Sequence, residues 1–512
     1  MEQQKKSKSI RLLNFIEEKG NKLPHPVTIF IIFTLLVIGL SHVLYVIGTS
    51  VSFEGVNKDS GQIETLTVKA VSLLVPEGIA YMFSNVVLNF TSFVALGPVL
   101  VAMIGVGVAE KSGYISAVMT NTVTKAPKKF VTPIVVLMGV LSNVAASVGY
   151  VVLVPLGAII FLGFKRHPLA GLSAAFAGVA GGYSANLFLG TNDPLLSGIT
   201  TEAAHILDAG YIVNPTDNWF YMFVSTFLIV IIGTLVTDKL IEPKLGKYIP
   251  SKGMEPQNVI TDVEKKGLLW ANISVVLTLI TIALLVLPEN GILRGEGGSI
   301  IQSPFMSSII FMMMLIFLVP GVVYGLVTKT IKNDKDIANL MTSSLETMAG
   351  FIVLIFFAAQ FVALFNYTNL GTIIAVKGAD FLQTIHLDGA PLLVALIFIT
   401  AIINLFIAAD SAKWAIMAPV FVPMFMQMGI APEVTQVAYR VGDSSTNIIS
   451  PLMPFFPLVV AFAQRYGKEN GVGTVISLML PYSIIILFGW TIFFVVWYVL
   501  GIPVGPGTNL NY

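Results

Sequence analysis

Four ionisable side chains lie within residues 404–457, in sequence otherwise apolar enough for a membrane interior. They are Asp410, Lys413, Arg440 and Asp443. A charge at the centre of a bilayer costs about 2.5–3.5 kcal/mol on insertion scales, so these four need an internal polar site. Polar clusters at 409–411 and 442–447 interrupt the apolar runs. A non-helical backbone segment inside a membrane is tolerated only where it is buried in protein or lines a water-filled cavity. The stretch predicts half of a site for a solute and ions.

The composition predicts an integral membrane protein. Of 512 residues, 55% are hydrophobic and 11% charged. Cysteine is absent, which excludes disulfides and thiolate metal sites. The apolar run 26–48 follows a basic segment and is too long for a signal-peptide core, so it predicts an uncleaved first span. The net charge of +1 indicates no partner by itself; the lipid bilayer is expected as surroundings, and no nucleic acid is expected to bind.

Apolar runs of about 20 residues predict the single membrane spans. They lie at 26–48, 93–110, 218–237, 267–287, 305–328, 345–366 and 476–500. Residues 49–92 are mixed in character and are predicted to lie at the outer surface. Residues 130–165 and 390–428 are predicted to be re-entrant hairpins, because arms of about 16 residues reach only about 24 Å as helix. Residues 168–200 and 432–466 are predicted to cross once each as broken helices.

The distribution of lysine and arginine supports this threading. With the N-terminus in the cytoplasm, 23 basic residues fall inside and 4 outside, as the positive-inside rule requires. The predicted fold is an all-α polytopic membrane protein with nine transmembrane helices and two re-entrant hairpins. Residues 1–25 form a cytoplasmic segment, residues 26–512 form a single membrane domain, and the C-terminus lies outside the cell membrane.

A weak internal repeat relates residues 93–200 to residues 345–466. Displaced by 264 positions, residues 147–150 fall on 411–414. Displaced by 261, Gly181, Ser184 and Asn186 fall on Gly442, Ser445 and Asn447. The first copy begins with a span running inward and the second with a span running outward, so the repeats are predicted to be inverted. Inverted repeats with broken helices are typical of secondary transporters, whose sites lie near the bilayer midplane.

Four motifs carry a resemblance to a known family. They are GTNDPLLSGI (190–199), ADSAKW (409–414), APEVTQVAYRVGDSSTN (431–447) and ISPLMPFFP (449–457). With them the chain resembles the AbgT family, the aminobenzoyl-glutamate transporters, over nearly its whole length.

The resemblance implies a homodimer whose protomers each have nine transmembrane helices, two opposed hairpins and a separate pathway. It implies cation-driven transport of p-aminobenzoyl-glutamate, a folate breakdown product, or of a related aromatic anion; some members export sulfonamide antimetabolites instead. The implied substrate-site positions are Asp193, Ser411, Trp414, Pro432, Arg440, Asp443 and Pro451.

Each charged residue has a functional and a structural interpretation. The planar guanidinium of Arg440 suits a substrate carboxylate, or it pairs with Asp443 three residues on. Asp193 couples an ion, or it caps a helix that begins at Pro194. Asp410 and Asp443 are ion ligands, or partners of Lys413 and Arg440; Asp410 and Lys413, three residues apart, favour a local pair. The indole of Trp414 stacks on an aromatic substrate, or only packs.

Neutral oxygens at the predicted hairpin tips and helix breaks suit Na⁺. Exposed carbonyls at such breaks coordinate Na⁺ in other secondary transporters, and a more distant similarity to sodium-coupled carboxylate transporters points to the same tips. The predicted ion-binding residues are Asn143, Asn186, Asn404, Asp410, Asn447, Ser142, Ser184 and Ser445. No cofactor and no metal beyond Na⁺ is expected, and the coupling ion is Na⁺ or H⁺.

Competing functions lack their motifs. An enzyme would need a catalytic constellation, and the sequence contains no HExxH, GxSxG or cysteine nucleophile. A primary pump would need a phosphate-binding loop, and no GxxxxGK[ST] occurs. Re-entrant hairpins also occur in channels, but a whole inverted repeat with paired broken helices favours alternating access.

Overall fold

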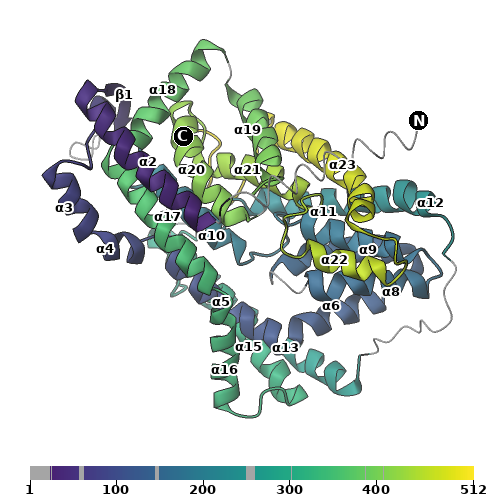
Figure 1. Cartoon of the computed structure of the whole chain (residues 1–512). Helices are drawn as coiled ribbons and strands as arrows, with labels where there is room; N and C mark the ends of the chain where they lie inside the picture. Colours follow the sequence, from purple (N-terminus) through teal and green to yellow (C-terminus); the bar gives the residue numbers. More distant parts are fainter. Residues whose placement is uncertain are drawn as a thin grey trace, which may run out of the picture.

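The computed structural model describes residues 24, 26–56, 63–144, 149–248, 260–300, 303–386, 388–407 and 409–512. The described chain is mostly helical (Figure 1). Of the predicted cytoplasmic segment 1–25, only Pro24 is described. Residues 145–148, at the tip of the first predicted hairpin, also lie outside the described part.

Six of the described helices are long and apolar enough to cross a membrane, and eight spans result if each of two bent helix pairs counts as one. The six are α2 (Pro26–Ile47), α11 (Trp219–Val236, continued by η5 Thr237–Ile241 and α12 Glu242–Leu245), α13 (Asp262–Val286), α15 (Ile309–Thr328), α17 (Ala349–Tyr367) and α23 (Val472–Val499). They coincide with six of the seven predicted single spans. The seventh, 93–110, corresponds to α5 (Leu96–Lys111), which is bent by 57° from α6 (Tyr114–Thr124). The total of nine crossings stays a prediction.

The two predicted repeats contain the same order of elements. The first has α5, α6, α7 (Val131–Leu141), η3 with α8 (Gly149–Leu153, Val154–Gly163), α9 with η4 (Pro168–Phe176, Ala177–Gly181) and α10 (Asn192–Ala204). The second has α17, α18 (Leu370–Thr384), α19 (Gly389–Asn404), α20 (Asp410–Gln427), α21 (Pro432–Asn447) and α22 (Phe456–Gln464).

The packing of the two copies also corresponds. In the first copy α7 packs against α9 and η4, and in the second α19 packs against α21. Each second hairpin arm contacts the other copy, since α20 packs on α10 and α8 contacts α22. The predicted broken spans are interrupted at 182–191 and 448–455, where the backbone leaves the helical conformation.

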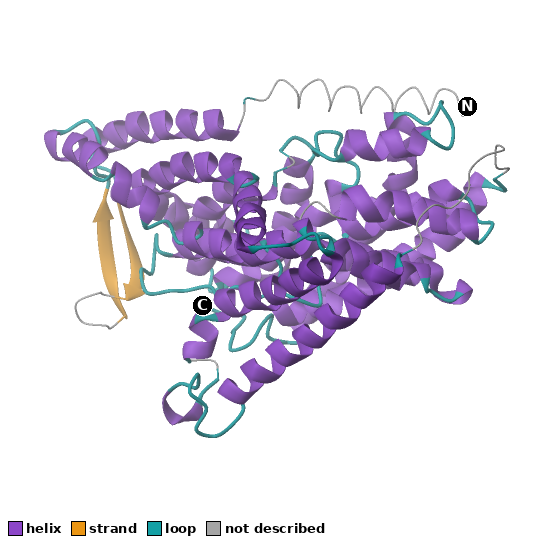
Figure 2. Ribbon diagram, turned by 90° about the horizontal axis from the view of Figure 1, so that it is seen from below, coloured by secondary structure: helices purple, strands orange, loops and turns teal. Residues whose placement is uncertain are grey.

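A two-stranded β-hairpin is an exception to the all-α prediction. Strands β1 (Ser50–Val56) and β2 (Ile63–Lys69) pair antiparallel and project from one end of the molecule (Figure 2). Val51 and Ala70 pack against Ile373 and Val376 of α18. The sequence ETLTVK contains alternating β-branched residues, a pattern that is typical of a β-strand. Helices α3 (Pro76–Ser84) and α4 (Val86–Thr91) follow the β-hairpin and complete the segment 49–92.

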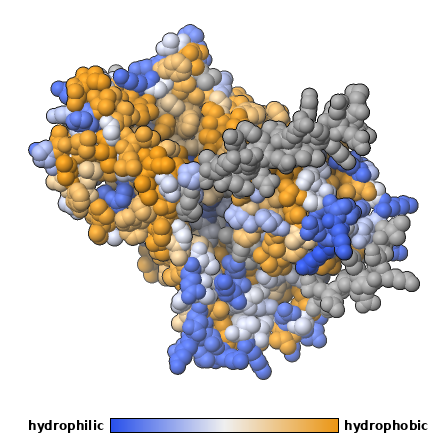
Figure 3. Space-filling view, in the orientation of Figure 1, coloured by the Kyte–Doolittle hydropathy of each residue, from blue (hydrophilic) through white to orange (hydrophobic). Residues whose placement is uncertain are grey.

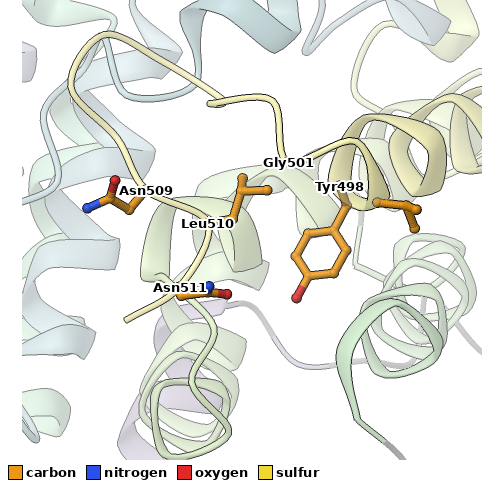
Figure 4. Close-up of a pocket in the computed structure, with 6 residues that line it drawn as sticks. Tyr498, Gly501, Asn509, Leu510 and Asn511 are labelled. Atoms are coloured by element: carbon orange, nitrogen blue, oxygen red, sulfur yellow. The ribbon is translucent and has the colours of Figure 1, made fainter.

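The C-terminal tail returns from α23 to the turn between α20 and α21. The backbone N–H of Ala431 donates to the carbonyl of Leu510 at 3.1 Å, and that of Tyr512 donates to Gly429 at 3.1 Å. Beside the C-terminal tail lies an open cavity of about 570 Å³, lined by Tyr498 of α23 and by Leu510 and Asn511 of the tail (Figure 4). The tail therefore links α23 to the entry of α21.

The surface is apolar over the side formed by α2, α3 and α4, as Figure 3 shows. Hydrophilic side chains gather at the end where α16 (Asp334–Glu346) lies. A short helix, α14 (Pro304–Ser307), precedes α15. Long helices with exposed apolar side chains, such as Leu35 on α2 and Leu277 on α13, fit a lipid environment.

Candidate functional site

Helix α21 is polar yet lies at the centre of the molecule. All 16 of its residues are buried. Pro432 occupies the first helical turn, where the missing N–H costs no hydrogen bond, and Ala431 before it is extended. Helices α10, α19, α20 and α23 pack around it. Buried polar groups must be satisfied inside the protein, so α21 requires partners from its neighbours.

Arg440, in the middle of α21, pairs with Asp193 on α10. Its Nη2 donates to Asp193 Oδ1, and its Nη1 donates to Asn218 Oδ1 at 3.4 Å. Asp193 Oδ2 accepts the backbone N–H of Gly190 at 2.6 Å. Arg440 is 2% exposed and Asp193 6%. The Nε of Arg440 is buried and has no hydrogen-bond partner among the described residues. The Nε–H of the guanidinium is therefore available to another group.

Two structural interpretations of these residues are wrong. Arg440 does not pair with Asp443, because the ion pair bridges from α21 to α10 instead of following the helix. Asp193 is not the cap of a helix starting at Pro194, since α10 begins at Asn192 after Thr191. Asp193 instead lies in the first turn, where a carboxylate is favoured by the helix dipole.

A chain of hydrogen bonds runs from Arg440 to the indole of Trp414. Trp414 Nε1 donates to Thr200 Oγ1 at 2.9 Å, and that hydroxyl is hydrogen-bonded to Gln436 Oε1. Gln436 Nε2 donates at 2.7 Å to Asn218 Oδ1, the oxygen that Arg440 also contacts. Trp414 is fully buried, with its ring 4.3 Å from that of Tyr439. The site is closed to solvent in this conformation.

Lys413, on α20, forms a second buried centre with Asp443. Its ammonium donates to Asp443 Oδ1 and to Asn404 Oδ1, and lies 3.5 Å from the carbonyl of Ile407. Asn404 Nδ2 is within hydrogen-bond distance of the carbonyl of Asp443 and of Asn447 Oδ1. Lys413 is fully buried and Asp443 is 1% exposed. The expected local pair between Asp410 and Lys413 is wrong, because the lysine side chain turns toward α21.

Other predicted site residues lie around these two centres. Asp410 begins α20; its carbonyl accepts the hydroxyl of Tyr439 at 2.6 Å, while its Oδ2 has no partner among the described residues. Ser411 follows it and is partly buried, Pro432 begins α21, and Pro451 lies in the break after α21.

The predicted ion-binding residues separate into two groups. Asn404, Asn447 and Ser445 lie with Lys413 in the second repeat, where Ser445 Oγ donates to Val441 in its own helix. The first-repeat group is Ser142, Asn143, Ser184 and Asn186. There Asn143 Nδ2 donates to the carbonyl of Gly182 at 3.3 Å, and Asn143 Oδ1 and Ser184 Oγ are buried without a partner among the described residues. Asp410 belongs to neither group by hydrogen bonding.

Comparison with known proteins identifies the family. The model of the AbgT transporter family matches residues 11–512. The chain belongs to the AbgT family. It is 39% identical over 502 residues to the p-aminobenzoyl-glutamate transport protein of Escherichia coli (strain K12), which covers 98% of this chain and 97% of that protein. This AbgT-family chain is accordingly a multi-pass membrane transporter, which agrees with the expectation that it is not an enzyme.

Two solved structures of transporters share its fold. The structure of MtrF from Neisseria gonorrhoeae, described as illuminating a class of antimetabolite efflux pumps, has a TM-score of 0.92 at 49% identity and covers 97% of this chain and 100% of that one. The YdaH transporter of Alcanivorax borkumensis, described as having an unusual topology, has a TM-score of 0.88 at 42% identity, with 94% and 100% covered.

Sequence reasoning missed three residues of this AbgT-family site: Thr200, Asn218 and Gln436. Gln436 could have been found from the sequence, because it lies four residues before Arg440 and so lies on the same face of the helix. Thr200 and Asn218 could not have been found from the sequence, because their roles depend on contacts with α20 and α21, which are distant along the chain. No group of three or more His, Cys, Asp and Glu that could hold a metal ion occurs in the described part of the chain.

Asp217, just before α11, makes the stability of the protein depend on pH. Burial raises the pKa of its carboxyl to about 7, although the N–H of Asn214, which donates to it at 2.7 Å, opposes the rise. The folded state therefore holds a proton that the unfolded state releases near 3.8, so stability should fall as pH rises between these values. In Asp217→Asn this fall should disappear, as thermal unfolding at several pH values would reveal. An unchanged pH profile would contradict the assignment.

Proposed function

We propose that this protein is a secondary active transporter of p-aminobenzoyl-glutamate, or of a closely related aromatic anion, across the cytoplasmic membrane. A gradient of Na⁺ or H⁺ drives it, and the solute site opens alternately to the two sides. The N-terminus lies in the cytoplasm and the C-terminus outside. The functional unit is a homodimer in which each protomer has nine crossings, two hairpins and a pathway of its own.

One observation carries the substrate assignment: a buried arginine with a spare donor is hydrogen-bonded through three polar side chains to a buried tryptophan. The Nε of Arg440 has no partner among the described residues, and a guanidinium binds carboxylates through its planar fork. Trp414 supplies an aromatic face at the other end of this chain. An anion that also carries an aromatic ring satisfies both ends. The E. coli relative is named for such a solute.

The transport cycle follows from the arrangement of the two repeats. We place Arg440 and Asp193 at their interface, because α21 belongs to the second repeat and α10 to the first. In inverted-repeat transporters, one repeat or bundle moves against the other around a site near the midplane. The closed state of Trp414 and Arg440 then corresponds to an occluded conformation. Opening would separate α10 from α20, which now share the bond between Thr200 and Trp414.

A second candidate function is the export of sulfonamide antimetabolites, which are also aromatic and weakly acidic. The likeness to MtrF, at 49% identity, favours it, because that protein is described as one of the antimetabolite efflux pumps. Another dicarboxylate-like anion would satisfy the same site. Each of these solutes has an acidic group that an arginine can bind, so only transport measurements separate them.

Uptake into proteoliposomes tests the proposal. Purified protein should accumulate labelled p-aminobenzoyl-glutamate when either an inward Na⁺ gradient or an inward H⁺ gradient is imposed, and should not accumulate it without a gradient, because only a coupled transporter concentrates its solute. Vesicles without protein are the control. Accumulation of sulfonamide alone would transfer the assignment to the second candidate. If the labelled solute only equilibrates across the vesicle membrane and neither gradient makes it accumulate, the protein is not a secondary active transporter.

A further inference from the structure

Two adjoining apolar cavities lie between the first repeat and two spans that belong to neither repeat. Their volumes are about 460 and 300 Å³. Phe188, Leu279, Ile316 and Phe317 line both cavities, so the two share a wall. Leu279 lies on α13, and Ile316 and Phe317 lie on α15, whereas Phe188 lies in the break at 182–191. The cavities therefore meet where the first broken span faces α13 and α15.

The polar side chains in these walls already have partners within the protein. The three hydroxyl-bearing ones, Tyr114, Ser142 and Thr216, each donate a hydrogen bond to another protein group, at distances between 2.6 and 3.4 Å. The indole N–H of Trp219 donates to the carbonyl of Leu187 at 3.0 Å. An ordered water needs two to four polar partners, and apolar cavities remain dry without them. These walls therefore offer little to water.

The cavities are continuous with the lipid-facing surface of α13. Leu279 lines both of them and is 47% exposed, and Phe188 on the opposite wall is 60% exposed. Leu277 and Ile280, next to Leu279 along the helix, are also exposed. Since α13 is one of the helices that can cross the membrane, its exposed apolar side chains face hydrocarbon. A molecule that enters past Leu279 therefore comes from the bilayer.

The walls are elongated and adaptable. Val275, Leu279 and Ile282 follow one another at spacings of four and three residues, which places them on one face of α13 over about 10 Å of its length. Methionine side chains are flexible and unbranched, and they adapt to partners of variable shape. Five of them line the cavities: Met119, Met138, Met306, Met312 and Met313. Such walls suit a long flexible apolar chain better than a rigid molecule.

We propose that an acyl chain of a membrane lipid occupies these joined cavities and forms part of the packing between the first broken span and helices α13 and α15. Protein interiors are close-packed, so an unfilled volume of this size would deprive its walls of dispersion contacts. No charged side chain lines the cavities in the described part of the chain, so nothing there recruits an ionic ligand. A hydrocarbon chain from the adjacent bilayer supplies the missing contacts.

The bound chain lies against the segment that leads to the substrate site. Leu187, Phe188 and Leu189 line the larger cavity, and Gly190, which follows them, donates its N–H to Asp193. A chain that is not covalently attached can slide, so it can fill this interface in more than one arrangement of the first repeat against α13 and α15. This consequence rests on the alternating movement of the proposed function, whereas occupation of the cavities does not.

Quenching of Trp219 by brominated lipid tests the occupation, because the ring of Trp219 lines the larger cavity. Full-length Trp270→Phe protein, which lacks the tryptophan that is 55% exposed on α13, is reconstituted into phosphatidylcholine vesicles with or without bromine on the acyl chains. Subtracting the emission of Trp219→Phe/Trp270→Phe isolates the signal of Trp219. This signal should be quenched in the brominated vesicles. An unquenched Trp219 would overturn the proposal.

Blocking the cavity shows whether the quenching chain lies inside it. The chain has no cysteine, so a single introduced thiol can be modified alone. Hexyl methanethiosulfonate attached to Leu279→Cys, in the Trp270→Phe background, should abolish the quenching of Trp219. The same reagent on Leu277→Cys, two residues away on the exposed face, should leave it unchanged. Equal quenching in the two modified variants would overturn the proposal, because bromine would then reach Trp219 from outside the cavity.

A second variant covers the case in which Leu279→Cys does not fold. Phe188→Cys, on the opposite wall, should lose the quenching in the same way when it carries the hexyl group. Quenching retained in the modified Phe188→Cys protein would overturn the proposal. None of these measurements requires transport. A chain whose Trp219 is quenched from within the cavity but that accumulates no solute would therefore contradict only the proposed function.

Discussion

Arg440→Lys should raise the KM for p-aminobenzoyl-glutamate about 10- to 100-fold while the protein still folds. A hydrogen bond to a charged group contributes about 1.5–3 kcal/mol, and each 1.4 kcal/mol is a factor of about ten in affinity. Lysine keeps the charge that Asp193 requires but loses the planar fork, including the Nε donor that has no partner among the described residues. Arg440→Ala should abolish uptake. Initial rates of uptake into proteoliposomes measure both effects.

The matched control for this prediction is Arg166→Lys. Arg166 also pairs with carboxylates, Asp238 and Glu242, and donates to Thr132, but it joins the base of the first hairpin to the end of α11. Its replacement should lower the unfolding temperature and leave the KM unchanged. A KM in Arg440→Lys equal to that of the parent protein would refute the role of the guanidinium in binding carboxylate. If Arg440→Lys fails to fold while Arg166→Lys folds, the ion pair between Arg440 and Asp193 is structural.

Much of the fold could be predicted because a membrane span needs an unbroken apolar run, which is a local property of sequence. Helices α2, α11, α13, α15, α17 and α23 follow such runs. The breaks near 182–191 and 448–455 could be predicted for a related reason, since glycine, proline and polar residues interrupt the apolar sequence there. The β-hairpin at 50–69 was missed because its polar and mixed residues carry little hydropathy signal, and only their alternation indicates strands.

The partners of the charged residues could not be predicted. Spacing of three residues suggested that Arg440 pairs with Asp443 and Lys413 with Asp410, because such residues are neighbours on a helix. The structure pairs each cation with a carboxylate of another helix, on α10 and α21 respectively. A long side chain in a buried site reaches across to the neighbouring helix, and the choice among acceptors depends on packing. Sequence therefore predicted which residues form the site but not how they are joined.

The buried pair of Lys413 and Asp443 should behave as a unit when it is mutated. Removing one partner leaves an uncompensated buried charge, which costs about 3–5 kcal/mol, whereas replacing both by apolar residues of similar volume is often neutral. We therefore expect Lys413→Met and Asp443→Leu each to reduce folded protein severely, and the double variant to recover most of the lost thermal stability. Uptake should stay lost in the double variant, because Asn404 and Asn447 lose the groups that orient them.

An exposed ion pair provides the comparison that makes this result interpretable. Lys265 pairs with Asp262 at 2.9 Å on the surface of α13, where solvent screens the two charges. Lys265→Met should leave the unfolding temperature nearly unchanged, because exposed ion pairs contribute little to stability. A double variant of Lys413 and Asp443 no more stable than either single variant would show that the two charges do not compensate each other. Recovery of uptake together with stability would instead make the pair purely structural.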